Sequence, residues 1–360
     1  MTAPSSTSGF ERILIVRLSS MGDVIHALPS AAMLREAFPH ATIAWLIEDR
    51  WAELLCALST PRAGARSRQR PLVNLIHAVS LKSWRHSIFC NHTWERIAAG
   101  LSDLRARHYQ VAVDLQGAVR SAILARWSGA PTIYGAVQTR ENIASMWYSR
   151  RVISEHSHVV EQYADLARAA IGRSLPIPEA ILPCDPIAEE TVEKRLRSLE
   201  IRVPAILNPG AGWGAKQWPA ERYGEVAQAL AGQGLRPIIN FGPREEALAK
   251  VAETASAGTA HALSFSVGEL IALMRRARLF IGGDTGPMHL AAALRVPIVA
   301  LFGPTDPARN GPYRTPSIVL RHPMSTTSLS HRMEPDRGLL AITTGEVIAA
   351  ATRLLERSGV

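Results

Sequence analysis

Cysteine is scarce in this chain, and the few cysteines present form no recognisable pattern. Cys56, Cys90 and Cys184 are widely spaced, odd in number and free of any CxxC pair. Such spacing favours neither a disulfide framework nor a zinc site. Long apolar runs are absent too, because no stretch is long enough to cross a bilayer and the N-terminus lacks the basic-then-apolar pattern of a secretion signal. We therefore expect a cytoplasmic protein.

Low-complexity sequence is also missing, apart from the polar opening at residues 1–9. The 360 residues are 47% hydrophobic and 20% charged, which is typical of a folded globular protein. Because a chain of this length exceeds what one hydrophobic core usually organises, two domains are expected.

The formal net charge of the whole chain is +9, and basic residues are concentrated in one stretch of it. Between residues 62 and 107, nine basic residues stand against only Glu95 and Asp103. A solvated surface would explain this stretch, but it also suits a phosphorylated ligand, an anionic membrane face or nucleic acid. Nucleic acid has little support, because neither zinc-finger spacing nor the aromatic signature of an RNA-recognition motif is present.

Strand and helix patterns alternate along both halves of the chain, and the two halves are separated by a proline-rich stretch at 176–186. In the first half, strands are predicted at 12–18, 42–47, 73–79 and 111–115, and helices at 24–37 and 94–107. In the second half, strands are predicted at 205–208, 237–241, 279–282 and 297–302, and helices at 220–231, 245–255, 267–276, 288–294 and 344–357.

This alternation predicts an α/β protein with two doubly wound, Rossmann-like domains that face each other across a cleft. We expect a first domain at 11–180, a second at 187–343 and a C-terminal helix at 344–358. In open α/β sheets, ligands bind beyond the carboxyl ends of the strands, so the loops that follow strands are the candidate sites.

A glycine-rich loop at 281–289 joins an apolar strand to a helix. Glycines allow close backbone approach, and the unpaired amides at a helix start attract anions. Thr285 and His289 add hydrogen-bond donors, which makes a diphosphate site plausible. In the alternative interpretation, Asp284 or Thr285 only caps the helix.

Two more loops in the second half follow strands. The loop at 208–219 contains three glycines and Lys216, which can stabilise charge on a departing diphosphate or simply be a solvated lysine. The loop at 241–246 offers Glu245 and Glu246. Either carboxylate can bind ribose hydroxyls or cap the next helix.

In the first half, the turn after the first strand ends in Asp23. This carboxylate can accept the proton of an attacking hydroxyl, although aspartate is also a favoured helix cap. Arg120 follows the Asp-Leu-Gln-Gly segment at 114–117, on a predicted helix that also contains Arg126. Together with Lys82 and Arg85, these arginines can bind acidic acceptor groups. Taken singly, each of these cations is equally consistent with a solvent-exposed side chain.

At these motifs the sequence resembles glycosyltransferase family 9, whose lipopolysaccharide heptosyltransferases have the GT-B fold. The stretches at 19–23 and 140–148 resemble the type I heptosyltransferases more than type II. One departure is the loop at 209–214, which carries glycines where better-known type I members have threonines. The matching stretches occur in the expected order between residues 11 and 313, at 19–29, 114–117, 140–148, 216–219, 284–289 and 302–307.

The resemblance implies inner-core assembly: inverting transfer of L-glycero-D-manno-heptose from ADP-heptose to a Kdo residue of Kdo-lipid A, with no cofactor or obligatory metal. It implies an ADP-sugar and an anionic glycolipid as partners, no nucleic acid, and peripheral contact with the cytoplasmic face of the inner membrane. Asp23 would be the general base, Lys216 a phosphate contact and Asp284 a heptose contact. The other expected donor contacts are Asn208, Gly210, Gly212, Gly242, Glu245, Thr285, Gly286 and His289. The expected acceptor contacts are Ser20, Met21, Gly22, Lys82, Arg85, Gln116 and Arg120.

Two kinds of alternative remain open at this stage. In the first alternative, this chain is a family 9 transferase that uses another ADP-sugar or an acceptor that already carries a heptose. A more distant alternative is a dinucleotide-dependent oxidoreductase, since doubly wound sheets host many dinucleotide sites. Its usual G-x-G-x-x-G turn after the first strand is missing here.

Overall fold

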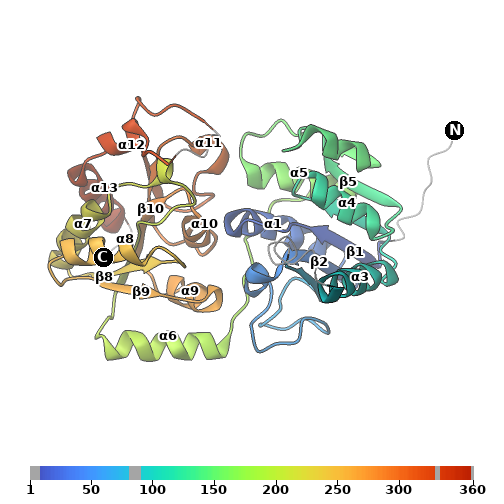
Figure 1. Cartoon of the computed structure of the whole chain (residues 1–360), viewed down its shortest axis with the longest axis horizontal. Coiled ribbons are helices and arrows are strands. Elements are labelled where there is room, and N and C mark those ends of the chain that lie inside the picture. The colour runs from blue at the N-terminus through green and yellow to red at the C-terminus, as the bar shows by residue number, and fades with distance from the viewer. Residues whose placement is uncertain (1–8, 81–90, 329–332, 358–360) are drawn as a thin grey trace. The chain divides into compact units, whose positions relative to one another are not determined.

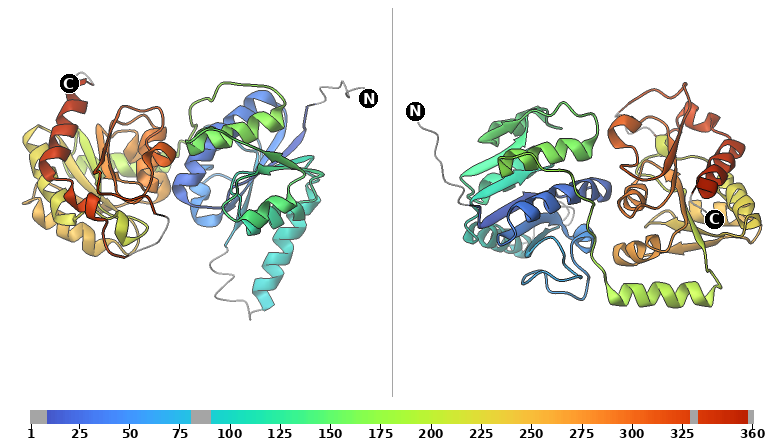
Figure 2. Two further views of the ribbon diagram at one scale, coloured as in Figure 1. Left: turned by 90° about the horizontal axis from the view of Figure 1, so that it is seen from above. Right: turned by 180° about the vertical axis from the view of Figure 1, so that it is seen from behind.

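The computed structural model describes residues 9–80, 91–328 and 333–357. The chain divides into two compact units, Met1–Pro183 and Cys184–Val360, with the boundary inside the proline-rich stretch. Each unit is built around its own six-stranded parallel sheet, and helices cover both faces of that sheet (Figure 1, Figure 2). These two sheets confirm the predicted α/β, doubly wound fold class.

The sheet of the first unit has the strand order β3-β2-β1-β4-β5-β6. Its central strand β1 pairs in parallel with β2 on one side and β4 on the other, and Ile13 to Val16 are fully buried. An apolar run of this kind is what a parallel strand needs when both of its faces are covered. The strands are β1 (Arg12–Val16), β2 (Thr42–Glu48), β3 (Leu75–Val79), β4 (Val111–Asp114), β5 (Thr132–Ala136) and β6 (Arg150–Val152).

Helix α1 is the most deeply buried helix element of this unit and packs against α5. It begins at Met21, three residues before the predicted start, because Ser20 provides the N-cap. Helix α5 ends at Ile171 and is followed by Gly172, whose φ of 78° is the left-handed conformation common after a helix. The helical elements are α1 (Met21–Ala37), η1 (Asp49–Leu54), α3 (Asn91–Ala106), α4 (Val119–Trp127), η2 (Asn142–Trp147) and α5 (Val159–Ile171).

The sheet of the second unit has the order β12-β11-β10-β7-β8-β9. Its strands are β7 (Pro204–Asn208), β8 (Arg236–Phe241), β9 (His261–Ser264), β10 (Leu279–Gly283), β11 (Ile298–Phe302) and β12 (Ser317–Arg321). Its helical elements are α6 (Pro186–Ser198), η3 (Gly214–Lys216), α7 (Ala220–Gly232), α8 (Glu246–Ala255), α9 (Val267–Met274), α10 (Gly286–Ala293), α11 (Pro307–Asn310), α12 (Arg337–Ala341) and α13 (Thr344–Arg357).

The last helix, α13, belongs to the core of the second unit. It packs against α7, β11 and β12, and its Val347 and Ala351 are fully buried in the same cluster as Tyr223. The indole Nε1 of Trp218 donates a hydrogen bond to the carbonyl of Ile342, just before this helix, at 3.0 Å. The amphipathic pattern that predicted a helix at 344–357 thus reflects burial of one face.

Four strands are missing from the sequence prediction: β5, β6, β9 and β12. These strands are short and only partly buried, and they lie toward the outer parts of the two sheets. They therefore lack the apolar runs that identify the central strands. No helix in the described part of the chain is long and apolar enough to cross a membrane.

Candidate active site

Asp23 closes the first turn of α1 in the first unit. Its Oδ2 accepts hydrogen bonds from the backbone N–H of Ser20 at 2.9 Å and from the Ser20 hydroxyl at 2.8 Å. This is the reciprocal arrangement of a capping box, in which the third residue of the helix binds back to the cap. Asp23 thus takes part in capping as the third helical residue, while Ser20 is the N-cap, and these bonds use only one carboxylate oxygen.

The second oxygen of Asp23 is held by Arg17, a residue that the sequence analysis did not select. Arg17 follows β1, and its Nη2 lies 2.7 Å from Asp23 Oδ1. Its Nη1 donates to the carbonyl of Leu115 at 2.7 Å, and its guanidinium lies over the ring of Tyr163. The Arg17 side chain is 6% exposed and the Asp23 side chain 33% exposed. The carboxylate is thus fixed in position while remaining open to solvent.

These contacts keep Asp23 ionised. Burial by itself raises the pKa of Asp23, but the charge of Arg17 and the hydrogen bonds from Ser20 and Arg17 lower it more, so the net pKa lies below the ordinary value. At neutral pH the side chain is a carboxylate that can accept a proton.

The Asp-Leu-Gln-Gly segment after β4 supports the same turn. The side-chain carbonyl of Gln116 accepts a hydrogen bond from the N–H of Leu18 at 2.8 Å. Asp114 is buried and accepts hydrogen bonds from the Tyr148 hydroxyl at 2.7 Å and the Ser121 hydroxyl at 2.8 Å. Burial raises the pKa of Asp114, and these hydrogen bonds oppose that rise.

Gly117 brings the segment after β4 together with the Arg140 stretch. Its φ of 66° is left-handed, and a Cβ there would lie 3.4 Å from the backbone of Thr139 and Arg140. Its carbonyl accepts from the N–H of Glu141, whose carboxylate in turn accepts from the N–H of Val119 at the start of α4. Two motifs separated in sequence thus form one structural unit.

The expected acceptor contacts are only partly gathered at this turn. Ser20 is exposed and contacts Asp23, while Met21 and Gly22 are buried in the first turn of α1. Arg120 is exposed on α4. Lys82 and Arg85 lie outside the residues that the structure describes.

A buried ion pair joins two loops of the second unit. Lys216 Nζ, at the end of the loop after β7, lies 2.5 Å from Asp284 Oδ2 and 3.2 Å from the Asp284 carbonyl oxygen. The other carboxylate oxygen of Asp284 is 3.1 Å from His289 Nε2. The ammonium also lies over the ring of Trp213, at 4.3 Å from its centroid. Lys216 is therefore an ordered side chain rather than a solvated one.

The Asp284 carboxylate lies between Lys216 and His289. Its side chain is 6% exposed. Burial raises its pKa, but His289 and Lys216 lower it more, and the net pKa lies well below the ordinary range. Asp284 is not the cap of α10, because Thr285 occupies that position while the two oxygens of Asp284 contact Lys216 and His289.

The start of α10 leaves its backbone amides without a side-chain cap. Thr285 occupies the N-cap position, but its hydroxyl donates to the carbonyl of Gly283 at 3.3 Å rather than accepting from the helix. Gly286, the first helical residue, presents no side chain there. An uncapped helix start of this kind is suited to an anionic group.

Of the two glutamates after β8, it is Glu245 that lies among these loops. Glu245 Oε2 accepts from the N–H of Gly242 at 2.8 Å. A Cβ at Gly210 would lie 2.1 Å from the same oxygen, so the carboxylate occupies the space that glycine leaves open. Glu246 is exposed and starts α8. Packing therefore places Glu245, rather than Glu246, beside the loop after β7.

Asparagine side chains brace the same loop. Asn208 Nδ2 donates to the carbonyl of Gly210 at 2.9 Å, and Asn208 Oδ1 accepts from Asn240 at 2.7 Å. Both asparagines are buried. Gly212 has nothing within 4 Å of its Cβ position, so no contact requires glycine there.

Thr305 lies in the matching stretch at 302–307 but was not selected as a site residue. It follows β11, as the other loops of the second unit follow their strands, and it is 5% exposed. Its hydroxyl is buried and has no hydrogen-bond partner in the described part of the chain. Buried polar groups are usually satisfied, so this hydroxyl is a further group available to a ligand. Its place after a central strand was the available signal.

No group of three or more metal-binding side chains is found within the described ranges.

Two doubly wound domains with candidate sites on the loops after parallel strands are the GT-B arrangement of glycosyltransferases. The chain belongs to one family of these enzymes: residues 98–335 match the profile of glycosyltransferase family 9 (heptosyltransferase). This membership excludes the oxidoreductase alternative.

Individual relatives support the same assignment. Lipopolysaccharide heptosyltransferase 1 of Pseudomonas aeruginosa is 29% identical, over 84% of this chain and 81% of its own length. Lipopolysaccharide heptosyltransferase 3 of Escherichia coli K12 is 27% identical, over 93% of this chain and 95% of its own length. The structure of the E. coli heptosyltransferase WaaC with ADP is similar at a TM-score of 0.76 and 26% identity, covering 97% of this chain and all of that one.

The contact between Glu245 and Gly210 yields a stability prediction. Gly210→Ala should push the flexible Glu245 carboxylate aside and destabilise the protein by about 0.5–1.5 kcal/mol, the net value of the hydrogen bond to the Gly242 N–H that is lost. In a Glu245→Ala background the same substitution should cost nothing more, because the clashing group is gone. Free energies of unfolding from denaturant titration measure this cycle.

Gly212→Ala is the matched control, since its methyl group meets open space. Equal losses from Gly210→Ala with and without Glu245 would refute the close approach.

Proposed function

We propose that this enzyme transfers L-glycero-D-manno-heptose from ADP-heptose to a Kdo residue of Kdo-lipid A in lipopolysaccharide core assembly. In this proposal residues 11–180 bind the acceptor and residues 187–343 bind the donor. The observation that carries it is the similarity over nearly the whole chain to a heptosyltransferase whose structure holds ADP. Similarity to a lipopolysaccharide heptosyltransferase 1 adds the acceptor class.

The donor side uses the loops of the second unit. Two N–H groups of Lys216 are directed at Asp284, which leaves the third for an oxygen of the diphosphate. The open amides at Gly286 supply further donors, and so does the Thr285 hydroxyl once it turns away from the Gly283 carbonyl. Glu245 can accept from ribose hydroxyls, and Asp284 keeps unused lone pairs for a heptose hydroxyl.

The chemical step is an inverting displacement. The acceptor hydroxyl oxygen attacks the anomeric carbon, its proton passes to the Asp23 carboxylate, and the bond from that carbon to the diphosphate oxygen breaks. The electron pair leaves with ADP, whose added charge is stabilised by Lys216 and the amides of α10. Arg17 holds Asp23 in place and keeps it ionised.

A second candidate is a family member that adds heptose to an acceptor already bearing heptose. Similarity to lipopolysaccharide heptosyltransferase 3, over 93% of the chain, favours it. Because the two candidates share a donor, only the acceptor separates them.

A transfer assay tests the proposal. We expect purified enzyme to join heptose from ADP-heptose to Kdo-lipid A, with much slower transfer from ADP-glucose and to a heptosylated core acceptor. Mass spectrometry of the glycolipid measures the product. A preference for the heptosylated acceptor would establish the second candidate instead, and absence of transfer with any ADP-sugar would reject both.

The base assignment predicts the behaviour of Asp23→Asn. This variant should lower kcat by about 10²- to 10⁴-fold, the usual contribution of a general base, while leaving the affinity for ADP unchanged. Asparagine keeps an oxygen that can accept from Ser20, so the cap of α1 is retained. Single-turnover kinetics and calorimetric ADP titration measure the two quantities.

Asp185→Asn, the same exchange at the cap of α6, is the control and should transfer heptose at the parent rate. Normal turnover by Asp23→Asn would reject the base assignment.

The ion pair with Arg17 predicts a change in pH dependence. Because the pKa of Asp23 is lowered below its ordinary value, the acid limb of the rate profile should lie at a lower pH than an ordinary aspartate would give. Arg17→Gln removes the charge that favours the carboxylate, so the limb should move to higher pH. Initial rates of heptose transfer between weakly acidic and neutral pH measure it.

Arg17→Lys retains the charge and should keep the parent profile. If Arg17→Gln lost activity equally at every pH, Arg17 would have only a structural role.

A further inference from the structure

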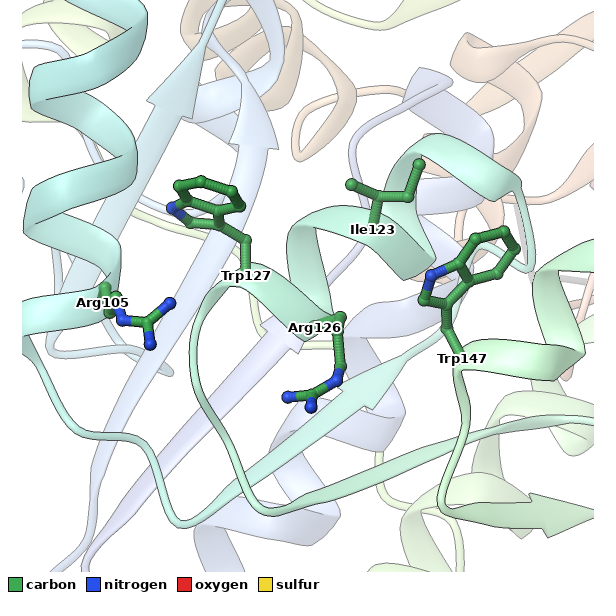
Figure 3. Close-up of a pocket in the computed structure, with 5 residues that line it drawn as sticks. All are labelled: Arg105, Ile123, Arg126, Trp127 and Trp147. Atoms are coloured by element: carbon green, nitrogen blue, oxygen red, sulfur yellow. The ribbon is translucent and has the colours of Figure 1, made fainter.

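The first unit carries an exposed surface where tryptophan and arginine side chains meet. A hollow of about 340 Å³ is lined by Trp127, Trp147 and Ile123 together with Arg105 and Arg126. Figure 3 shows these five side chains. The lining residues come from α3, α4 and η2, and α4 packs directly against η2. None of these residues belongs to the proposed catalytic groups.

The apolar part of this surface is exposed to an unusual degree. Trp127 is 46% exposed, and the neighbouring η2 adds Ile143 at 60% and Met146 at 72%. Single exposed apolar residues are common, but here they lie on two elements that pack against each other, α4 and η2. Trp147 is half-buried, packs against the hydrophobic core and also lines the hollow.

The polar part of this surface is cationic. Arg105 and Arg126 are exposed and, among the residues that the structure describes, neither has a hydrogen-bond or ion-pair partner. Arg151 adjoins η2 through a hydrogen bond from its Nε to the carbonyl of Ser145. Guanidinium groups bind phosphate oxygens well, and tryptophan favours the boundary between headgroups and acyl chains.

We propose that this surface, made of Ile123, Trp127, Ile143, Met146, Arg105 and Arg126, docks the enzyme onto an anionic phospholipid bilayer. The apolar side chains enter the boundary between headgroups and acyl chains, and the two arginines bind lipid phosphates. The inference rests on the proposed function in that a glycolipid acceptor is embedded in a bilayer. The charge complementarity between the two arginines and lipid phosphates, and the exposed apolar side chains, favour lipid independently of that function.

Vesicle binding tests the proposal. The full chain should co-sediment with phosphatidylglycerol-containing vesicles and far less with pure phosphatidylcholine vesicles. Trp127→Ser with Met146→Ser should weaken binding to the anionic vesicles about tenfold or more, because most of the inserted apolar area is lost. Arg105→Gln and Arg126→Gln should each weaken it about fivefold, an effect that added salt reduces in the parent.

The control is Ile187→Ser with Arg202→Gln, which removes an exposed isoleucine and an exposed arginine from the second unit. It should bind vesicles as the parent does. Equal weakening by this control, or parent-like binding by all the surface variants, would overturn the proposal.

Transfer to a water-soluble, deacylated acceptor separates this inference from the proposed function. The surface variants should act on it at the parent rate and lose activity only on acceptor embedded in vesicles. Vesicle binding without transfer to either acceptor would count against the proposed function alone. Transfer to the soluble acceptor without vesicle binding would count against the docking surface alone.

Discussion

The ion pair between Lys216 and Asp284 is the contact on which the second unit's candidate site depends. It connects the loop after β7 with the loop after β10, and it does so in a nearly dry environment. A buried charge is tolerated only when it is paired and hydrogen-bonded, and here each ion has more than one partner. The result is a lysine held rigidly at the carboxyl edge of the sheet. Such order reduces the reorganisation needed when negative charge develops on a leaving group.

The first unit also contains an ion pair at the edge of its sheet, but the burial of the two charges is reversed. There the buried member of the pair is the cation, Arg17, and the accessible member is the carboxylate, Asp23. The arginine also binds the carbonyl of Leu115, so the turn after β1 is tied to the end of β4. In both units a charged side chain at the end of a central strand fixes its counterpart. Parallel strands make this possible, since their carboxyl ends lie at one edge.

The surface around Trp127 differs from these two ion pairs in the exposure and the pairing of its side chains. Its side chains are exposed, and its arginines have no partner in the described part of the chain, whereas the proposed catalytic groups are paired and partly buried. Pairing gives precision where bonds change, while unpaired cations and exposed indoles suit a large, fluid partner. The proposed catalytic groups therefore need charged partners close by, whereas the surface around Trp127 needs exposed apolar and cationic side chains.

The sequence by itself determined the central strands, the helices that follow them and the loops that carry the motifs, because these signals are local. Apolar runs marked β1 and β7, and the Gly-Asp-Thr-Gly segment marked the start of α10. Only the tertiary structure decided that Glu245 rather than Glu246 lies over Gly210, that Lys216 pairs with Asp284, and that Arg17 holds Asp23. Partners such as Lys216 and Asp284 are 68 positions apart. Their contact depends on strand order and side-chain packing, and local sequence patterns predict neither.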